Sequence, residues 1–314
     1  MKKETVIYLS SNGRSRISAK LFLPEDDVPV KGMVQISHGM CEYVGRYEQL
    51  AQYLCDRGYA VCGNDHLGHK NTALLNRERL GYFGNVGSWS YLVEDLELLR
   101  QKLAPRFPRL PWYLLGHSMG SFIARMYLHA FGMNITGLIL SGTAGTTPAA
   151  LAGKSMAASS IVLHGPRYVS NAVYGAASKS FNRRIHHPRT WADWISRDPD
   201  ICAAYVQDPY CNFKFCVSAY YDLFQMLLLC NRKEWYGAVR RTLPVLLISG
   251  EEDPVGNYGK GPREVAEKLL KRGLDDVTLL LYPGGRHEMF NEINRTEVYE
   301  DLYQWLERET TETI

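Results

Sequence analysis

Residues 111–130 read PWYLLGHSMGSFIARMYLHA. An apolar run typical of a strand leads into the turn Gly116-x-Ser118-x-Gly120, and a helical pattern follows. A serine in this context is typical of a nucleophile elbow, in which a strained turn holds the hydroxyl out of a sheet. Strand and helix pass so close there that the flanking residues must be glycines. The N-terminus of the helix also directs backbone N–H groups at a developing oxyanion. We therefore predict that Ser118 is a nucleophile and that the N–H of Met119 is an oxyanion donor.

On both sides of this stretch, short apolar strands alternate with amphipathic helices. We expect strands near 4–10, 16–23, 33–37, 59–64, 112–115, 136–141, 244–249 and 277–282, and helices near 46–57, 89–103, 118–131, 262–272 and 295–308. The first two strands would form a hairpin through the turn at Asn12-Gly13. The alternation indicates an α/β fold, in which a mostly parallel sheet of eight strands is covered by helices on both faces.

The alternation stops at Gly142 and resumes at the strand near 244. Residues 143–242 contain short helical patterns and many aromatic side chains, and a structureless loop of that length would be unusual. We predict a core formed by residues 1–142 and 243–314, with a helical cap at 143–242 inserted after the sixth strand. Within the cap, residues 219–230 (AYYDLFQMLLLC) are apolar almost all round. Packing of the cap and the wall of an acyl-chain tunnel are both possible explanations.

A serine hydroxyl becomes a nucleophile when an imidazole takes its proton, and a carboxylate orients that imidazole. His287 follows the last expected strand, and Glu251, Glu252 and Asp253 follow the strand before it. This order of serine, acid and histidine matches that of enzymes with a strand-to-helix elbow. We predict that His287 is the general base and Asp253 the orienting acid, because Pro254 stiffens the backbone beside it. Glu252 is the alternative acid.

A second oxyanion donor is expected in the loop after the third strand. That loop, residues 37–47, reads SHGMCEYVGRY. Its position predicts that the backbone N–H of Met40 acts together with that of Met119.

Five segments, HGMCEYVGRY, NDHLGHKNT, GHSMG, GEEDPVGNYGKG and YPGGRHEMFNE, together resemble the monoacylglycerol lipase and lysophospholipase branch of the α/β-hydrolases, also called serine aminopeptidase-like. The resemblance covers about 30–142 and 243–310. It implies an α/β-hydrolase fold and a serine hydrolase that cleaves lipid-like carboxylic esters through an acyl-enzyme. It supports Asp253 as the acid and implies that Glu42 and Arg46 shape the glycerol end of the substrate pocket. Tyr43, where the family often has His, and the loop around Lys70 depart from the family pattern.

Other features of the sequence exclude several classes of function. The formal charge is +3, from 36 basic and 33 acidic residues, which predicts no nucleic-acid partner. The seven cysteines lack Cys-x-x-Cys spacing, and no other ligand spacing predicts a metal or cofactor. The N-terminal segment MKKETVIYLSSNG lacks the apolar region of a secretory signal, and no apolar run is long enough to span a membrane. We expect a cytoplasmic protein with reduced thiols, whose partners are a small acyl-ester substrate and, transiently through the cap, a membrane surface.

Two other functions remain open at this point. An iminopeptidase-type serine aminopeptidase would use the same three residues and would also need carboxylates that hold the free amine of its substrate. A non-catalytic ligand-binding protein of this fold is less favoured, because all three predicted catalytic residues are present.

Overall fold

An eight-stranded sheet lies at the centre of the protein, as a computed structural model describes it for residues 1–178 and 180–313. The order across the sheet is β1-β2-β4-β3-β5-β6-β7-β8. The β1–β2 and β2–β4 pairs are antiparallel, and the other neighbours are parallel. The strands are β1 Lys2–Leu9, β2 Arg16–Leu23, β3 Gly32–Ser37, β4 Tyr59–Asn64, β5 Trp112–His117, β6 Gly137–Ser141, β7 Val245–Gly250 and β8 Val277–Tyr282. The predicted fold class is confirmed.

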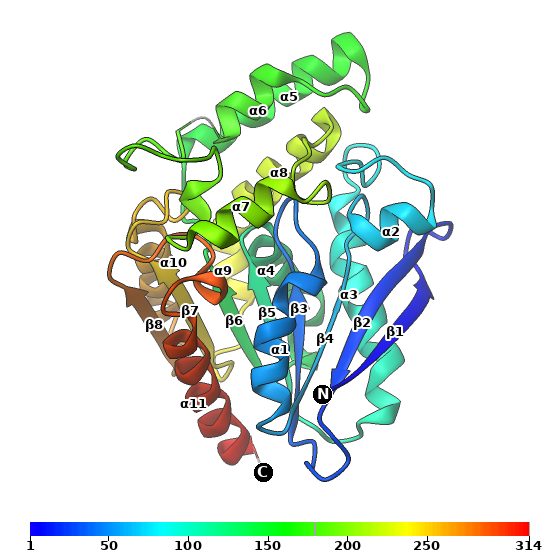
Figure 1. Ribbon diagram of the computed structural model, residues 1–314, viewed down its shortest axis with the longest axis vertical. Helices are drawn as coiled ribbons and strands as arrows, with labels where there is room; N and C mark the ends of the chain where they lie inside the picture. The colour runs from blue at the N-terminus through cyan, green and yellow to red at the C-terminus, as the bar shows by residue number, and fades with distance from the viewer. Residues whose placement is uncertain (179, 314) are drawn as a thin grey trace.

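Helices cover both faces of this sheet (Figure 1). On one face lie α1 (Glu48–Cys55) and α11 (Arg295–Thr313), whose apolar side chains share a core cluster with the sheet. On the other face lie α3 (Trp89–Leu103), α4 (Met119–Phe131) and α10 (Lys260–Lys271). All six residues of β5 are buried, as expected for a strand covered on both sides. The elbow serine therefore follows a strand that is fixed by packing from both layers.

Five α-helices and one short 3₁₀ helix (Asp193–Ile195) lie between β6 and β7 in the part of the chain that the structure describes. The α-helices are α5 Pro148–His164, α6 Asn171–Ser178, α7 Pro199–Gln207, α8 Val217–Cys230 and α9 Lys233–Ala238. Helices α5 to α8 lie over one end of the sheet, with α5 and α6 outermost, whereas α9 lies beside α4 and α10 (Figure 1). Helix α8 packs against α5 on one side and against α4 of the core on another, and α9 also packs against α4. The two-sided packing accounts for the nearly uniform apolar surface of α8. The division of the chain at 143–242 remains a proposal, because α8 and α9 belong to both layers.

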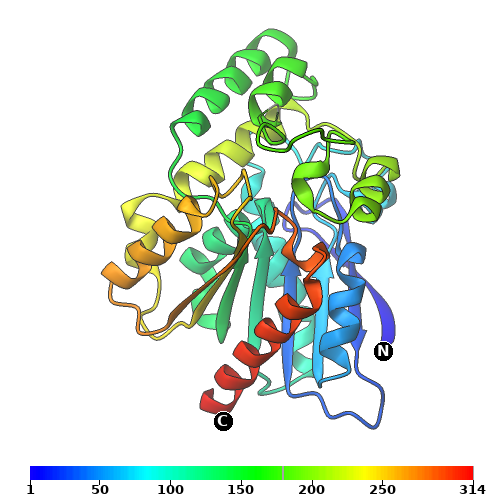
Figure 2. The same cartoon turned by 60° about the vertical axis from the view of Figure 1, so that its left-hand side comes forward.

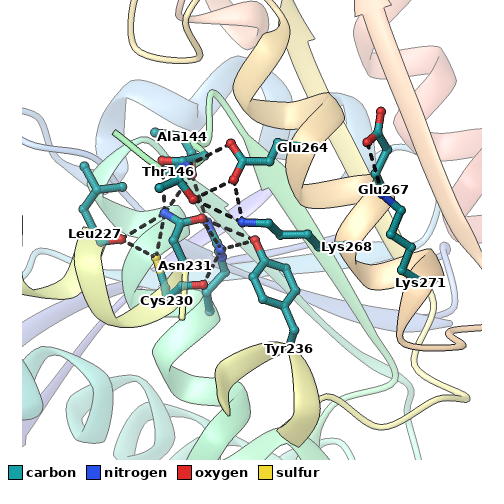
Figure 3. A network of polar contacts seen from close by, with 12 residues as sticks. Ala144, Thr146, Leu227, Cys230, Asn231, Tyr236, Glu264, Glu267, Lys268 and Lys271 are labelled. Carbon is teal, nitrogen blue, oxygen red and sulfur yellow. Dashed lines mark hydrogen bonds and ion pairs between the residues drawn. The ribbon is translucent and has the colours of Figure 1, made fainter. Parts of the chain in front are cut away.

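A buried arginine joins these last two helices to the core. Arg125, in α4, is fully buried, and its guanidinium donates to the carbonyl of Ala144 (3.0 Å), the side-chain oxygen of Asn231 (3.0 Å) and the hydroxyl of Tyr236 (3.2 Å). It also donates to the carbonyl of Cys230. Figure 3 shows these partners beside Thr146, Glu264 and Lys268, which continue the network to α10. Removing one partner of such a buried group costs several kcal/mol, so the network fixes the position of α8 and α9.

Candidate active site

Ser118 lies between β5 and α4 with φ 52° and ψ −119°, a conformation that few residues other than glycine adopt. A Cβ on Gly116 would lie 2.4 Å from the carbonyl oxygen of Gly120, and a Cβ on Gly120 only 1.9 Å from that of Ser37. The N–H of Ser118 donates to the carbonyl of Ser141 (2.9 Å), which ties the turn to β6. The structure therefore has the strained turn, flanked by obligatory glycines, that the sequence predicts.

His287 and Asp253 meet in a buried hydrogen bond. The Nδ1 of His287 lies 3.0 Å from Oδ1 of Asp253, and the two side chains are 3% and 0% exposed. The same carboxylate oxygen accepts the N–H of Val255 (2.8 Å), which fixes its orientation. Glu252 is exposed, and its backbone N–H donates to the carbonyl of Gly285. Of the two candidate acids, the structure brings Asp253 to the histidine.

The electrostatic environment of His287 suits a general base. Burial lowers the pKa of its imidazole, but the charge and the hydrogen bond of Asp253, with the charges of Glu288 and Glu42, raise it above the ordinary value. With Nδ1 donating to the carboxylate, Nε2 is left as the acceptor for a serine proton. The neighbouring charges would stabilise the imidazolium that forms when that proton arrives.

An aromatic residue of the cap covers this imidazole. The ring centroid of Trp194 lies 4.9 Å from that of His287, and the backbone carbonyl of Trp194 accepts the N–H of His287 (3.4 Å). From the core side, the ring of His117 lies 4.7 Å from the same imidazole. The sequence predicts a cap rich in aromatic residues, but it does not indicate which ring lies over His287.

A cavity of about 420 Å³ opens beside Ser118. Met40 and Met119, the residues predicted to supply the oxyanion amides, line it together with the serine. Most of the remaining wall is apolar and comes from α4, the cap helices and the loop after β7, including Phe122, Phe181, Trp194, Leu223, Phe224, Leu227 and Val255. The apolar segment 219–230 thus both packs in the core and lines the cavity. Tyr220 and Met226 are fully buried in the core cluster, whereas Leu223, Phe224 and Leu227 line the cavity.

Glu42 and Arg46 form a buried ion cluster with Glu288. Arg46 donates to both carboxylate oxygens of Glu288 (2.6 and 2.7 Å) and to Glu42 (3.2 Å). The other oxygen of Glu42 accepts from the hydroxyl of Tyr47 (2.8 Å) and from the N–H of Gly39. Burial raises the pKa of Glu42 to about 7, since the opposing effect of Arg46 is partly offset by the charge of Glu288.

The substrate-binding role that the family resemblance implies for Glu42 and Arg46 stays a prediction. Neither Glu42 nor Arg46 lines the cavity beside Ser118. Gly39 precedes Met40 and Glu288 follows His287, so the ion cluster connects the loop that carries Met40 to the loop that carries His287. The partner Glu288 was missed, because an ion pair across 242 positions leaves no local signal in one sequence.

Three buried histidines pack together at the start of the loop that carries Met40. The Nε2 of His38 accepts the backbone N–H of His66 (3.0 Å), and its Nδ1 is hydrogen-bonded to the carbonyl of Gly39 (2.8 Å). His69 packs beside His38 with ring centroids 4.9 Å apart. Burial lowers the pKa of His66 to about 3 and that of His69 to about 4, so these rings are neutral. Across the described residues, no group of three or more His, Cys, Asp or Glu side chains is placed to hold a metal ion.

Over residues 1–178 and 180–313, no helix is both long and apolar enough to cross a bilayer.

Comparisons with known proteins identify the family. The chain is 28% identical over 297 residues to a monoacylglycerol lipase of Mycolicibacterium smegmatis, covering 94% of each chain. It is 27% identical over 285 residues to a monoglyceride lipase of Homo sapiens, covering 89% of this chain and 84% of that protein. Among solved structures, it is similar to a highly thermostable carboxyl esterase from Bacillus coagulans in complex with glycerol, with a TM-score of 0.92, 32% identity and 99% coverage of both chains. Residues 28–294 match the serine aminopeptidase, S33 family. The chain therefore belongs to this family of α/β-hydrolases, in the branch that contains the monoacylglycerol lipases.

Proposed function

We propose that the protein is a serine carboxylic-ester hydrolase that cleaves monoacylglycerols and similar lipid-like acyl esters. The observation that carries the proposal is the buried pair of His287 and Asp253 beside the strained Ser118 turn, next to an apolar cavity. The similarity to two monoglyceride lipases and to a carboxyl esterase supports the same activity.

In the proposed mechanism, the hydroxyl of Ser118 attacks the ester carbonyl while Nε2 of His287 takes its proton. Asp253 stabilises the imidazolium, and the N–H groups of Met40 and Met119 bind the oxyanion. His287 then protonates the leaving alcohol, so that an acyl-enzyme remains on Ser118. A water molecule, deprotonated by the same imidazole, releases the fatty acid and restores the serine.

The apolar cavity would receive the acyl chain. A buried CH₂ contributes about 0.8 kcal/mol, so each added carbon should raise kcat/KM about fourfold until the cavity is filled. The test is a series of p-nitrophenyl esters from two to sixteen carbons, with unblocked amino-acid anilides alongside. We expect medium or long chains to be preferred over acetate. A profile that is flat beyond four carbons would contradict a lipid substrate.

The outer face of the cap supports a transient contact with a membrane surface. Leu151, Val162 and Leu163 of α5 are 60%, 85% and 74% exposed. This helix lies on the side of the cap away from the sheet (Figure 2). We also propose a cytoplasmic location, because all seven cysteines are free and buried, as is usual in a reducing compartment.

The peptidase alternative is not favoured. A free amine would need an available carboxylate near the nucleophile, and Glu264 is the one carboxylate among the described residues that line the cavity beside Ser118. It is already bonded to Lys268 (2.5 Å) and to the hydroxyl of Thr146 (2.6 Å). Rapid cleavage of unblocked anilides, lost on N-acetylation, would reverse this conclusion.

A further inference from the structure

A second cavity adjoins the cavity beside Ser118. Its volume is about 810 Å³, and Met40 and Trp194 line both cavities, whereas Ser118 lines only the first. Trp194 also covers the imidazole of His287, since the two ring centroids lie 4.9 Å apart. The second cavity therefore begins beside this imidazole.

This position makes the second cavity a space for the alcohol part of an ester. In the proposed mechanism, His287 donates a proton to the alcohol oxygen as the ester bond breaks, so that oxygen must lie close to the imidazole. The acyl chain occupies the apolar cavity beside Ser118. The alcohol part can then extend past Trp194 into the second cavity.

Aromatic rings distinguish the lining of the second cavity. Six of its seventeen described lining residues are aromatic, against five of twenty-seven in the cavity beside Ser118. The six are Tyr174, Trp191, Trp194, Tyr205, Phe213 and Tyr220. Trp191 is 43% exposed, and Tyr174 and Phe213 are half-buried, so these rings keep surface that a ligand can contact. Rings attract one another in stacked or edge-to-face arrangements, which adds to the free energy gained by burial alone.

Contacts with the core hold several of these rings in place. Trp191 packs edge-on against Tyr205 with centroids 5.8 Å apart, and the guanidinium of Arg46 lies 4.8 Å from the centre of the Tyr205 ring. Phe213 packs against His69 at 5.7 Å. A wall that is already ordered loses little entropy when a rigid ring binds, whereas a flexible alkyl chain gives up rotamer freedom. The second cavity therefore suits a ring better than a second alkyl chain.

Glycerol would fill little of this cavity. It has six non-hydrogen atoms, and if each took about 30 Å³, the share of a water molecule in the liquid, glycerol would occupy less than about a quarter of the 810 Å³. An alcohol that carries a ring would cover more of the aromatic wall. The size and the lining of the cavity therefore both point away from a three-carbon alcohol.

We infer that the second cavity binds the alcohol part of acyl esters whose alcohol carries an aromatic ring. This inference rests on the proposed function and specifies the alcohol of its substrate as an aryl-alkyl alcohol. Esters of glycerol would react at the same three residues but would leave the ring site empty. Contacts between rings should then separate substrates that are equally apolar.

The chemical step is the same as for an ester of glycerol. The acyl carbon forms a bond to the oxygen of Ser118, and its bond to the alcohol oxygen breaks. The proton of Ser118 passes through His287 to the alcohol, which leaves through the second cavity. Water then cleaves the acyl-enzyme, which releases the fatty acid and restores the serine.

The test uses the butanoate esters of 2-phenylethanol, 1-pentanol and glycerol. The first two are primary alcohols that partition about equally between water and octanol, so burial of apolar surface favours neither. Butanoate release gives kcat/KM for each ester below its solubility limit. We expect the phenylethyl ester to be preferred over the pentyl ester by about fivefold, because ring–ring contacts contribute beyond burial, and the glycerol ester to be the poorest.

Variants of two wall residues connect this preference to the second cavity. Trp191→Leu/Phe213→Leu keeps apolar side chains but removes two rings, so the preference for the phenylethyl over the pentyl ester should fall below about twofold. Trp191→Phe keeps a ring and should retain most of the preference. The control is Tyr168→Leu, because Tyr168 is 42% exposed, which is close to the value for Trp191, and lines neither cavity. This control should show the preference of the wild type.

The results separate the inference from the proposed function. A wild type that reacts with a fluorophosphonate but does not prefer the phenylethyl ester would overturn the inference. So would a double variant that loses kcat/KM equally on both esters and keeps the preference, because the rings would then only support the fold. If the double variant does not fold, the single variant Trp191→Leu at the exposed position provides the same comparison. If the wild type cleaves none of the three esters and does not react with a fluorophosphonate, the proposed function itself fails.

Discussion

Replacing Asp253 by Asn tests the assignment of the acid. The carboxylate is fully buried, 3.0 Å from Nδ1 of His287, and its charge and hydrogen bond raise the pKa of that imidazole against the lowering effect of burial. The amide keeps the shape but removes the charge, so the imidazolium of the transition state loses its counter-ion. The same change in a comparable triad lowers kcat by about 10⁴, which corresponds to about 5 kcal/mol of barrier. Glu252→Gln, at an exposed carboxylate whose side chain does not contact His287, should change kcat less than about twofold.

The pH profile provides a second readout of the same variant. The base must be neutral to accept a proton, so activity falls as the pH drops through the pKa of His287. In the wild type this limb should lie above the ordinary histidine value, because the folded pKa is raised. In Asp253→Asn, burial still lowers the pKa of His287, but the carboxylate that mainly raises it is gone. The acid limb of the pH profile should therefore move to lower pH. The assay is hydrolysis of a p-nitrophenyl ester between pH 4 and 9, normalised to active sites titrated with a fluorophosphonate. A larger loss in Glu252→Gln, or an acid limb that stays in place in Asp253→Asn, would refute the assignment.

Four other outcomes are expected. Ser118→Ala should abolish fluorophosphonate labelling and leave the melting temperature nearly unchanged, because the strained turn persists; labelling that survives in the same cavity would move the nucleophile elsewhere. Gly120→Ala places a Cβ 1.9 Å from the carbonyl of Ser37 and should destabilise by about 3 kcal/mol, a fall of about 4 to 5 °C in Tm, whereas Gly237→Ala has open space and should not lower it. The pKa of His69 is lowered to about 4, so the unfolded chain takes up its proton first and stability falls as the pH drops from about 6.5 toward 4. His69→Gln should therefore remove about 2 kcal/mol from the difference in unfolding free energy between pH 7 and pH 5; an unchanged difference would show that this ring is protonated in the folded state. Extensive chelation should leave ester hydrolysis intact, and a loss restored by one divalent ion would contradict the metal-free mechanism.

Much of the core could be predicted from the sequence because its signals are local. All eight strands lie within about two residues of their expected ends, since each is a short apolar run bounded by turns. Helix α2 (Lys70–Leu75) was not expected, because its six residues are too few to show a helical apolar stripe. The final helix extends to Thr313 rather than 308 because its end, rich in Glu and Thr, continues without a glycine or proline that would stop it.

In the candidate site too, some features have a local sequence signal and others do not. The elbow could be recognised because five consecutive residues and their flanking elements carry the pattern. The choice between Asp253 and Glu252 depends on which side chain turns inward, and in the structure Asp253 is the one hydrogen-bonded to His287. The role of Arg46 could not be foreseen, because its strongest contact is with Glu288 on a distant loop. The position of Trp194 over His287 depends on how the cap packs against the core, and no local sequence pattern predicts that packing.

The network around Arg125 limits how relatives of this enzyme could exchange caps. A chimera with its junctions at residues 143 and 242 would replace Ala144, Cys230, Asn231 and Tyr236, the four residues whose oxygens bind the buried guanidinium. The foreign segment would then have to supply four matching oxygens to this charge. Junctions at about 145 and 215 would keep these four oxygens and exchange α5 to α7, but the foreign α5 would still have to pack against α8. By the same reasoning, α6 and α7 can diverge more freely between lineages, whereas α5 must match α8, and α8, α9 and α4 must change together.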